Sequence, residues 1–331
     1  MADPEVLEGA ALARVLRQAG GAEILNTLGV QLSGSDLVTL LLAAFRTRAG
    51  FLAPDDVLRR YAEERSMAPA PVDLRRLRRI EDRLLSVVPD EVEVLALAPV
   101  VPLGTHSVVA GVHQNNVLAT VRGSEVAADP ANGLALEAAV RRREARTRGR
   151  AVPPVRLAAL QRVIRRVPGS GRFAHVGLFA LATAGRDSGG LAFERRHAAE
   201  QLRLLCAALR AAGAGAVEVT ATLLDPAAAP VTEAVRAALA DHPDVVLAEA
   251  VDRAGGRRYH TGWCFTLAAV RDGVRVELGA GGFVDWTQRL LGNPRERLLV
   301  STIGVDRLAD LLVTSAPGGE STPSGGDPPD S

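Results

Sequence analysis

The sequence contains no lysine, so all 39 of its Lys+Arg residues are arginine. Mechanisms that need a Schiff-base lysine or the lysine of a phosphate-binding P-loop are therefore excluded. Cysteine is almost absent too, with only Cys206 and Cys264 in 331 residues. Two cysteines are too few for a cysteine metal cluster or a disulfide framework, which favours a reducing compartment. We expect a cytoplasmic protein.

The chain also lacks a dominant charge, because 39 basic residues nearly balance 38 acidic ones. Bulk attraction to nucleic acid or to an anionic membrane is not expected, so any phosphate binding has to be local. No apolar run reaches the length of a transmembrane helix, and the first ten residues, MADPEVLEGA, lack the basic-then-apolar order of a signal peptide. We expect no membrane association.

The composition is that of a globular protein, with 47% hydrophobic and 23% charged residues. Residues 4 to 66 carry apolar side chains at helical spacing, and either Ser33 or Ser35 is placed to cap a strongly apolar helix. Prolines in 67–74 predict a linker, and the Gly, Pro, Ser and Asp that follow Thr314 predict disorder. The expected division is a helical N-terminal domain (1–70), a body (71–313) and a disordered tail (314–331).

The body mixes helices and strands without strict alternation. The turn VPGSG joins strand patterns at 155–166 and 172–183, which predicts an antiparallel hairpin. VLATVRGSEV (117–126) predicts a further strand, and a long helix is expected from about 193 to 212. This order disfavours a doubly wound parallel sheet. It favours an α+β fold, in which a mostly antiparallel sheet is flanked by helices.

Four segments of the body occur in an order found in one enzyme family. They are a helix from Leu74 with a strand ending at Pro99 or Pro102, then VLATVRGSEVAADPANGLALEAA, then QRVIRRVPGSGRFAHVG, and last YHTGWCF with GAGGFVD and STIGVDRL. Over residues 75 to 312 they resemble the catalytic core of class II aminoacyl-tRNA synthetases. The resemblance is to the histidyl-tRNA synthetase branch, which includes a regulatory paralog of ATP phosphoribosyltransferase. It implies a class II synthetase-like antiparallel sheet and a homodimer paired through the first segment.

The resemblance implies an amino-acid pocket. Glu125, with Arg122 beside it, falls in the segment that contacts the substrate amino group, and His175 replaces a glutamine of the second motif. Tyr259 and His260 fall where a tyrosine-rich strand lines the pocket, and strand alternation predicts that only one of them faces it. The alternatives are an exposed strand carboxylate for Glu125, a satisfied core histidine for His175, and core packing for the aromatic residues.

The resemblance also implies a nucleotide site. Arg165 falls on the arginine of motif 2, Arg307 on the arginine of motif 3, and Arg172 on the "GR" after the motif 2 loop. Gly281 and Gly282 suit close backbone packing beneath an adenine. The implied cofactors are ATP and Mg2+, and no metal site made by the protein itself is expected. The alternative for Arg165 and Arg307 is an ordinary surface position.

The implied reaction explains why arginines are needed. Adenylation brings a carboxylate to the α-phosphorus of ATP, so two anions approach while negative charge builds on the phosphoryl oxygens. The guanidinium group binds phosphate oxygens in bidentate fashion and stays charged at any working pH. Arg165 would then hold the α-phosphate and Arg307 the γ-phosphate.

Departures from the family pattern leave the function open. Gly255 replaces an arginine of the histidyl pocket, and Thr266 replaces an acid. Phe283 replaces the arginine of "GGRYD", and Thr302 replaces the first motif 3 glycine. No anticodon-binding domain is expected.

One hypothesis for the function is a ligase that activates an amino acid or related carboxylate for an unidentified acceptor, which is a tRNA, a carrier protein or a small molecule. The other is a non-catalytic, amino-acid-sensing regulatory subunit. A third is that the N-terminal helices dock a partner or nucleic acid and the body is a scaffold.

One further segment, AGRDSGGLAFE (184–194), has two interpretations. Its glycines around Arg186 and Asp187 either form an anion-binding turn before a helix or make a tight connection.

Overall fold

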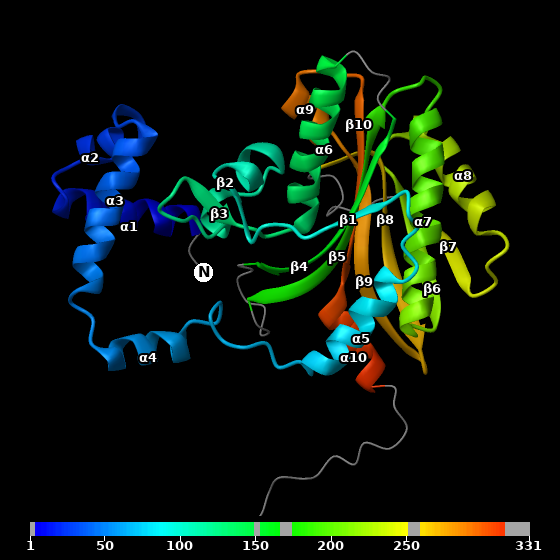
Figure 1. Ribbon diagram of the computed structural model, residues 1–331, viewed down its shortest axis with the longest axis horizontal. Helices are drawn as coiled ribbons and strands as arrows, with labels where there is room; N and C mark the ends of the chain where they lie inside the picture. Colours follow the sequence, from blue (N-terminus) through cyan, green and yellow to red (C-terminus); the bar gives the residue numbers. More distant parts are fainter. Residues whose placement is uncertain (1–3, 149–152, 166–173, 251–258, 315–331) are drawn as a thin grey trace, which may run out of the picture.

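The computed structural model describes residues 4–148, 153–165, 174–250 and 259–314, so the tail expected after Thr314 lies outside the described residues. The expected α+β fold is confirmed: one eight-stranded sheet has helices on both faces, with a helical N-terminal region beside it (Figure 1). Its strands are β1 (Glu93–Leu95), β4 (Val155–Ile164), β5 (His175–Arg186), β6 (Ala216–Leu223), β7 (Val245–Ala250), β8 (His260–Arg271), β9 (Val274–Val284) and β10 (Glu296–Gly304).

The sheet has the strand order β1-β4-β5-β10-β9-β8-β6-β7. The pairs β1–β4 and β6–β7 are parallel, and the other neighbours are antiparallel. The predicted hairpin of β4 and β5 is confirmed, with Val155 opposite Ala184 and Ile164 opposite His175. This mostly antiparallel order excludes a doubly wound fold.

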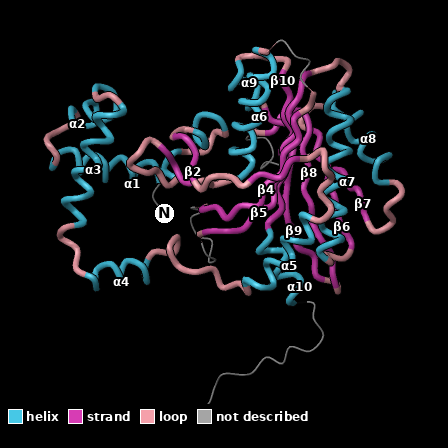
Figure 2. Tube along the Cα trace, viewed as in Figure 1, coloured by secondary structure: helices cyan, strands magenta, loops and turns pink. Residues whose placement is uncertain are grey.

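The central strands are apolar on both faces because helices cover both sides (Figure 2). In β5, Phe179 and Leu181 belong to one buried cluster, whereas Ala180 and Ala182 belong to the other. A strand with one solvated face would alternate apolar and polar residues, but a strand covered on both faces is apolar throughout.

One face of the sheet carries four helices. They are α5 (Leu74–Leu85), α7 (Ala192–Ala212), α8 (Ala229–Leu239) and α10 (Val305–Thr314). In α7, Leu202, Leu205 and Leu209 are fully buried at spacings of three and four residues and pack in the cluster that contains Val217 and Leu267. Each fully buried leucine contributes roughly 1.5–3 kcal/mol, so this stripe fixes the helix to the sheet.

The other face carries α6 (Pro130–Thr147) and α9 (Trp286–Leu291). Ala135 and Ala138 of α6 meet Ala180 and Ala182 of β5 in one cluster, so small side chains on both sides allow close packing. Helix α6 covers β4 and β5, and its N-terminus lies beside the short helix η2 (Thr105–Val109). This arrangement leaves a cavity on the sheet in front of the start of α6.

The segment 117–126 is strand only at its end. The structure has β3 (Ser124–Val126), paired with β2 (Val100–Pro102), and a single bridge between Ala119 and Glu125. Gly123 has a φ of 67°, in the left-handed region, and the hydroxyls of Thr120 and Ser124 hydrogen-bond at 2.7 Å. The prediction of a continuous strand was therefore wrong, because the chain folds back in a tight turn at 121–123.

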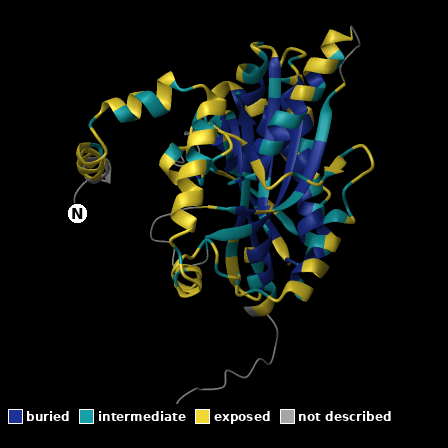
Figure 3. Cartoon of the chain, turned by 60° about the vertical axis from the view of Figure 1, so that its left-hand side comes forward, coloured by how far each residue is buried: buried dark blue, intermediate teal, exposed yellow. Residues whose placement is uncertain are grey.

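The N-terminal region is helical, as expected, and consists of α1 (Pro4–Gln18), α2 (Glu23–Asn26) with the helix η1 (Thr27–Gln31), α3 (Gly34–Ala49) and α4 (Pro54–Glu63). Ser33, rather than Ser35, caps α3, since its hydroxyl accepts a hydrogen bond from the Asp36 amide at 3.2 Å. No residue between 9 and 76 is buried, and Figure 3 colours these helices as mostly exposed.

In the described part of the chain, no individual helix has the length and hydropathy of a membrane span; α3 and α4 pass that test only as a pair, with a 108° bend between them.

Deleting residues 1–63 should leave the stability of the body nearly unchanged, because the described side chains of this region are not buried. Surface changes usually alter stability by less than about 0.5 kcal/mol. That corresponds to a shift in Tm of roughly 1–2 °C for a body of this size. Thermal unfolding followed by circular dichroism measures it, and a much larger fall in Tm would show that the helices support the body.

Candidate active site

A cavity of about 760 Å3 lies on the sheet face that carries α6. Its floor includes Leu178 of β5, Thr302 of β10 and Ala280 of β9, and Thr302 pairs with Ala280 in the sheet. Its walls include the N-terminal turn of α6 and His106 of η2. The volume is in the range of sites for small molecules and nucleotides.

Arg165 lines this cavity at the end of β4. Its Nη2 donates to Oδ2 of Asp129 at 2.5 Å, and its Nε donates to the Ala128 carbonyl at 3.0 Å. The other oxygen of Asp129 accepts from the Ala131 amide at 2.9 Å and so caps α6. The guanidinium group is thereby held at the N-terminus of the helix.

Arg307 lines the same cavity from the first turn of α10. Its Nη1 donates to the Glu277 carbonyl at 3.2 Å. The neighbouring Asp306 is buried and accepts from Nη2 of Arg162 at 2.8 Å and from the Gly177 amide. This anchors the start of α10 to β4 and β5, and with it the backbone of Arg307. The fold thus brings together the two arginines that the resemblance singled out.

Tyr259 and His260 both line the cavity, so the expectation that only one of them faces it was wrong. Gly262 has a φ of 69°, and the register of β8 with β9 shifts between His260 and Cys264. Regular alternation therefore begins only after this bulge. The Tyr259 ring lies 4.3 Å from the His260 ring and 6.2 Å from Trp286, measured between centroids.

His260 is held as a neutral imidazole. Burial lowers its pKa to about 4, although a hydrogen bond with the Phe283 backbone acts in the opposite direction. Its Nδ1 is buried and has no hydrogen-bond partner. Partial burial and the Asp129 carboxylate raise the pKa of Tyr259. Both groups are therefore uncharged at neutral pH.

Gly281 and Gly282 let three strands approach closely. A Cβ on Gly281 would lie 2.6 Å from Phe265 Cζ and from the Val300 carbonyl oxygen. A Cβ on Gly282 would lie 2.7 Å from the Nδ1 of His260. Any side chain at these positions would displace the strands beneath the cavity. Gly281 lines the cavity, and contact of either glycine with a nucleotide remains a proposal.

Glu125 and Arg122 do not line the cavity. Glu125 is fully buried, and its carboxylate accepts hydrogen bonds from Gly104 N (3.1 Å), His106 N (2.8 Å), Gln114 Nε2 (2.9 Å) and His106 Nδ1 (2.6 Å). Burial raises its pKa, but these hydrogen bonds outweigh that effect and the net pKa is lowered. The expectation that Glu125 faces a substrate amino group is corrected, because its oxygens are engaged by donors in the connection between β2 and β3. Arg122 is exposed in the turn.

His175 contacts the linker and lies outside the cavity. The Nε2 of His175 lies 2.7 Å from the Ala68 carbonyl oxygen and its Nδ1 lies 3.0 Å from Nη1 of Arg162, so its ring faces the linker. His175 is absent from the cavity wall, whereas its neighbour Val176 is present, which corrects its expected position. Arg172 and Gly255 lie outside the described residues.

Two polar residues of the cavity were not indicated by the sequence motifs. Asn132 is 3% exposed, and its Nδ2 is a buried donor with no partner. The Asp-Pro pair at 129–130 was the available signal, since a capping acid followed by proline begins a helix and places Asn132 in its first turn. The other is His106, whose Nδ1 bonds Glu125 and whose Nε2 accepts from the Ala128 amide at 3.0 Å. This pattern assigns the neutral tautomer to His106 and fixes the loop before α6.

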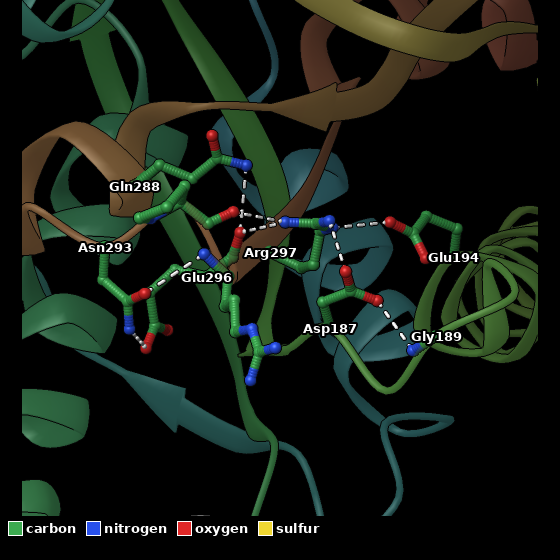
Figure 4. A network of polar contacts seen from close by, with 9 residues as sticks. Asp187, Gly189, Glu194, Gln288, Asn293, Glu296 and Arg297 are labelled. Carbon is green, nitrogen blue, oxygen red and sulfur yellow. Dashed lines mark hydrogen bonds and ion pairs between the residues drawn. The ribbon is translucent and has the colours of Figure 1, made fainter.

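The segment 184–194 is a tight connection. The carboxylate of Asp187 accepts from Nη2 of Arg297 and from the Gly189 amide, both at 2.8 Å (Figure 4). Asp187 itself therefore occupies the turn in which an anion was considered.

Three solved structures with similar folds are histidyl-tRNA synthetases or proteins related to them. Apo histidyl-tRNA synthetase from Staphylococcus aureus matches with a TM-score of 0.54 and 15% identity over 72% of this chain, which spans only 65% of that protein. An ATP phosphoribosyltransferase regulatory subunit/histidyl-tRNA synthetase from Bacillus halodurans matches with a TM-score of 0.54 and 13% identity, over 74% of this chain and 82% of that one. A histidine–tRNA ligase subunit from Alicyclobacillus acidocaldarius matches with a TM-score of 0.55 and 18% identity, over 75% and 95%.

The chain has a class II synthetase-like fold. The resemblance inferred from four sequence segments is confirmed for the fold. No protein-family model matches the sequence, and no curated protein matches it by sequence. At identities of 13 to 18% the class II synthetase-like fold is shared, while the activity has to be argued from the site.

The pKa of His260 predicts a pH-dependent stability. Its folded-state pKa of about 4 lies below the unfolded value near 6.5, so the unfolded state binds more protons between these values. Stability is complete above pH 6.5 and falls as the pH drops toward 4. The difference in unfolding free energy between the wild type and His260→Gln should shrink by about 2 kcal/mol from pH 8 to pH 5.

Urea unfolding of both proteins at several pH values measures this difference. His197, whose pKa is also lowered by burial, is present in both proteins, so its contribution cancels. A pH-independent difference would show that His260 is not held neutral.

Proposed function

We propose that the chain forms an acyl-adenylate from ATP and an amino acid or related carboxylate. The observation that carries the proposal is the placement of Arg165 and Arg307, distant in sequence, in the wall of one cavity. Two fixed guanidinium groups offset the charge of a triphosphate and of the attacking carboxylate. The chain contains no lysine, so the permanent positive charge at this site has to come from arginine.

The donors at the cavity fit a nucleotide. Besides the two arginines, the unpartnered Nδ2 of Asn132 lies in the first turn of α6, where backbone amides also favour an anion. No group of three His, Cys, Asp or Glu residues is placed to hold a metal within the described ranges. Mg2+ usually binds through one or two carboxylates plus substrate phosphates, and Glu277 is the exposed carboxylate at this cavity. Bound there, the ion would neutralise charge on the phosphate oxygens.

In the proposed reaction, a carboxylate oxygen of the substrate attacks the α-phosphorus and pyrophosphate leaves. Arg165 holds the α-phosphate and stabilises the charge that builds on its oxygens, and Arg307 holds the γ-phosphate. His260 is neutral and adds no charge to the pocket, so it orients the acid through hydrogen bonding only. The proposal includes a cytoplasmic location, a homodimer and no membrane partner. It does not identify the acceptor of the acyl group.

Replacing either arginine tests the proposal. Arg165→Ala and Arg307→Ala should each reduce amino-acid-dependent pyrophosphate exchange by roughly 100- to 1000-fold, the usual effect of removing one donor to transition-state charge. Arg122→Ala is the matched control, because Arg122 is exposed in a turn and outside the cavity. Exchange is measured over a panel of amino, hydroxy and aryl acids.

The stabilisation of the protein by ATP and Mg2+ is measured in parallel as a rise in Tm. The rise should disappear in Arg307→Ala and persist in Arg122→Ala. Well-folded protein that shows neither exchange nor stabilisation by ATP would rule out the ligase.

A second function, sensing of a free amino acid without catalysis, is favoured by one observation. The Nη2 of Arg165 is already engaged by the Asp129 carboxylate, so that group is not free for phosphate in this conformation. A protein related to the regulatory subunit would be stabilised by an amino acid and unaffected by ATP. That result would support the sensor in place of the ligase.

A further inference from the structure

A chain of hydrogen bonds leads from the buried carboxylate of Glu125 to Arg165, the arginine proposed to hold the α-phosphate. Glu125 and His106 are 0% and 1% exposed, and Oε1 of Glu125 lies 2.6 Å from Nδ1 of His106. The backbone amides of Gly104 and His106 and the side-chain amide of Gln114 also donate to this carboxylate. Although burial opposes it, these hydrogen bonds lower the pKa of Glu125, so the carboxylate is ionised at neutral pH.

The carboxylate fixes the protonation of the His106 ring. An ionised carboxylate only accepts, so Nδ1, which faces it, carries a proton. The Ala128 amide donates to Nε2 at 3.0 Å, so Nε2 is the acceptor of the ring. A proton on Nε2 would set two donors against each other at this distance. The imidazole is therefore neutral and in its Nδ1–H form.

His106 in turn holds the peptide group between Ala127 and Ala128. The amide at the Ala128 end donates to His106, and the carbonyl at the Ala127 end accepts from the Ile164 amide at 3.1 Å. This peptide is thus fixed at both ends, between η2 and the last residue of β4. The next carbonyl along the chain, that of Ala128, accepts from Nε of Arg165 at 3.0 Å. The position of this carbonyl therefore depends on the ring of His106.

The Ala128 carbonyl and Asp129 hold different nitrogens of the Arg165 guanidinium group. Nε donates to the carbonyl, whereas Nη2 donates to Oδ2 of Asp129 at 2.5 Å. The side chains of Arg165 and Asp129 are 41% and 28% exposed, and an ion pair with this exposure is weak enough to open. When Nη2 leaves Asp129 for a phosphate oxygen, the bond from Nε to the backbone can stay. The Ala128 carbonyl is then the pivot about which the guanidinium group turns.

We propose that Glu125 and His106 are positioning residues, which direct Arg165 toward the α-phosphate through the Ala128 carbonyl. This role rests on the adenylation proposed for the cavity. Neither residue touches the nucleotide, and the pair acts by keeping one backbone carbonyl in place. A misplacement of about 1 Å at a reacting group can cost roughly 100-fold in rate, so a fixed pivot has a measurable effect. Buried polar groups of this kind add little net stability and serve to fix one arrangement.

Asparagine and glutamine at position 106 separate the two hydrogen bonds of the ring. In His106→Asn the amide takes the place of Nδ1 and can donate to Glu125, but no acceptor reaches the Ala128 amide. In His106→Gln the side-chain oxygen takes the place of Nε2 and accepts from Ala128. His106→Asn should lower kcat of pyrophosphate exchange roughly 10- to 100-fold, and His106→Gln should recover most of that loss. KM for ATP should change little, because Arg307 still holds the γ-phosphate.

Double variants show whether His106 acts through Arg165. In the Arg165→Ala background, His106→Asn should cause no further loss of exchange, because the group that it positions is absent. In the Arg307→Ala background, it should reduce exchange by the same factor as in the wild type. A general loss of structure would slow exchange in both backgrounds. His113→Asn is the matched control, since His113 is exposed in the next loop and does not line the cavity.

The tautomer of His106 is measured in the wild type without an activity assay. Nitrogen nuclear magnetic resonance of protein labelled at its histidines should show a protonated Nδ1 and an unprotonated Nε2, with the signals assigned through His106→Gln. This spectrum decides if His106→Asn does not fold. A proton on Nε2 at neutral pH would overturn the positioning role.

Failure of the positioning role can be told apart from failure of the ligase. Folded wild-type protein without exchange would rule out both. Exchange in the wild type that His106→Asn leaves unchanged would overturn the positioning role alone. So would an equal loss in His106→Asn and His106→Gln, or a loss that adds to that of Arg165→Ala.

Discussion

The cavity of the candidate active site depends on the close approach of β8, β9 and β10, which the glycines of β9 make possible. A Cβ on Gly279 would lie 2.1 Å from the Thr302 carbonyl oxygen, and one on Gly281 would lie 2.6 Å from Ser301 Cβ. Without side chains there, the paired strands lie close enough for Ala280 to form part of the floor of the cavity. Gly282 lets His260 lie against the same strand, because a Cβ there would be 2.7 Å from its Nδ1, and burial lowers the pKa of His260.

The fold could be predicted where local pattern and tertiary packing agree. The pairing of β4 with β5 and the long stripe of α7 were both predicted correctly, because turn residues and helical spacing act over a few positions, although the turn 167–171 itself lies outside the described residues. The two cavity arginines were found only through the order of motifs, since in a chain without lysine a single arginine carries little information.

The site could not be predicted where a local irregularity decides which way a side chain faces. Gly262 introduces a bulge that lets Tyr259 and His260 share one cavity, and an alternation rule cannot anticipate a bulge. Glu125 looks like an exposed strand residue, yet four donors from η2 and its neighbours surround it. Those donors come from a loop whose path depends on tertiary packing, so no period in the sequence reveals them.

The choice between ligase and sensor depends on how firmly Asp129 holds Arg165, and the exposure of the pair decides this. Their side chains are 28% and 41% exposed, and an ion pair of this kind contributes about 0–1 kcal/mol. Asp129 would keep its bond to the Ala131 amide if Arg165 turned to a phosphate. By contrast, Arg142 and Glu296 are 3% and 5% exposed, and breaking such a buried pair costs roughly 3–5 kcal/mol. The contact that occupies Arg165 is thus of the kind that a triphosphate can displace, so the ligase requires this ion pair to open when ATP binds.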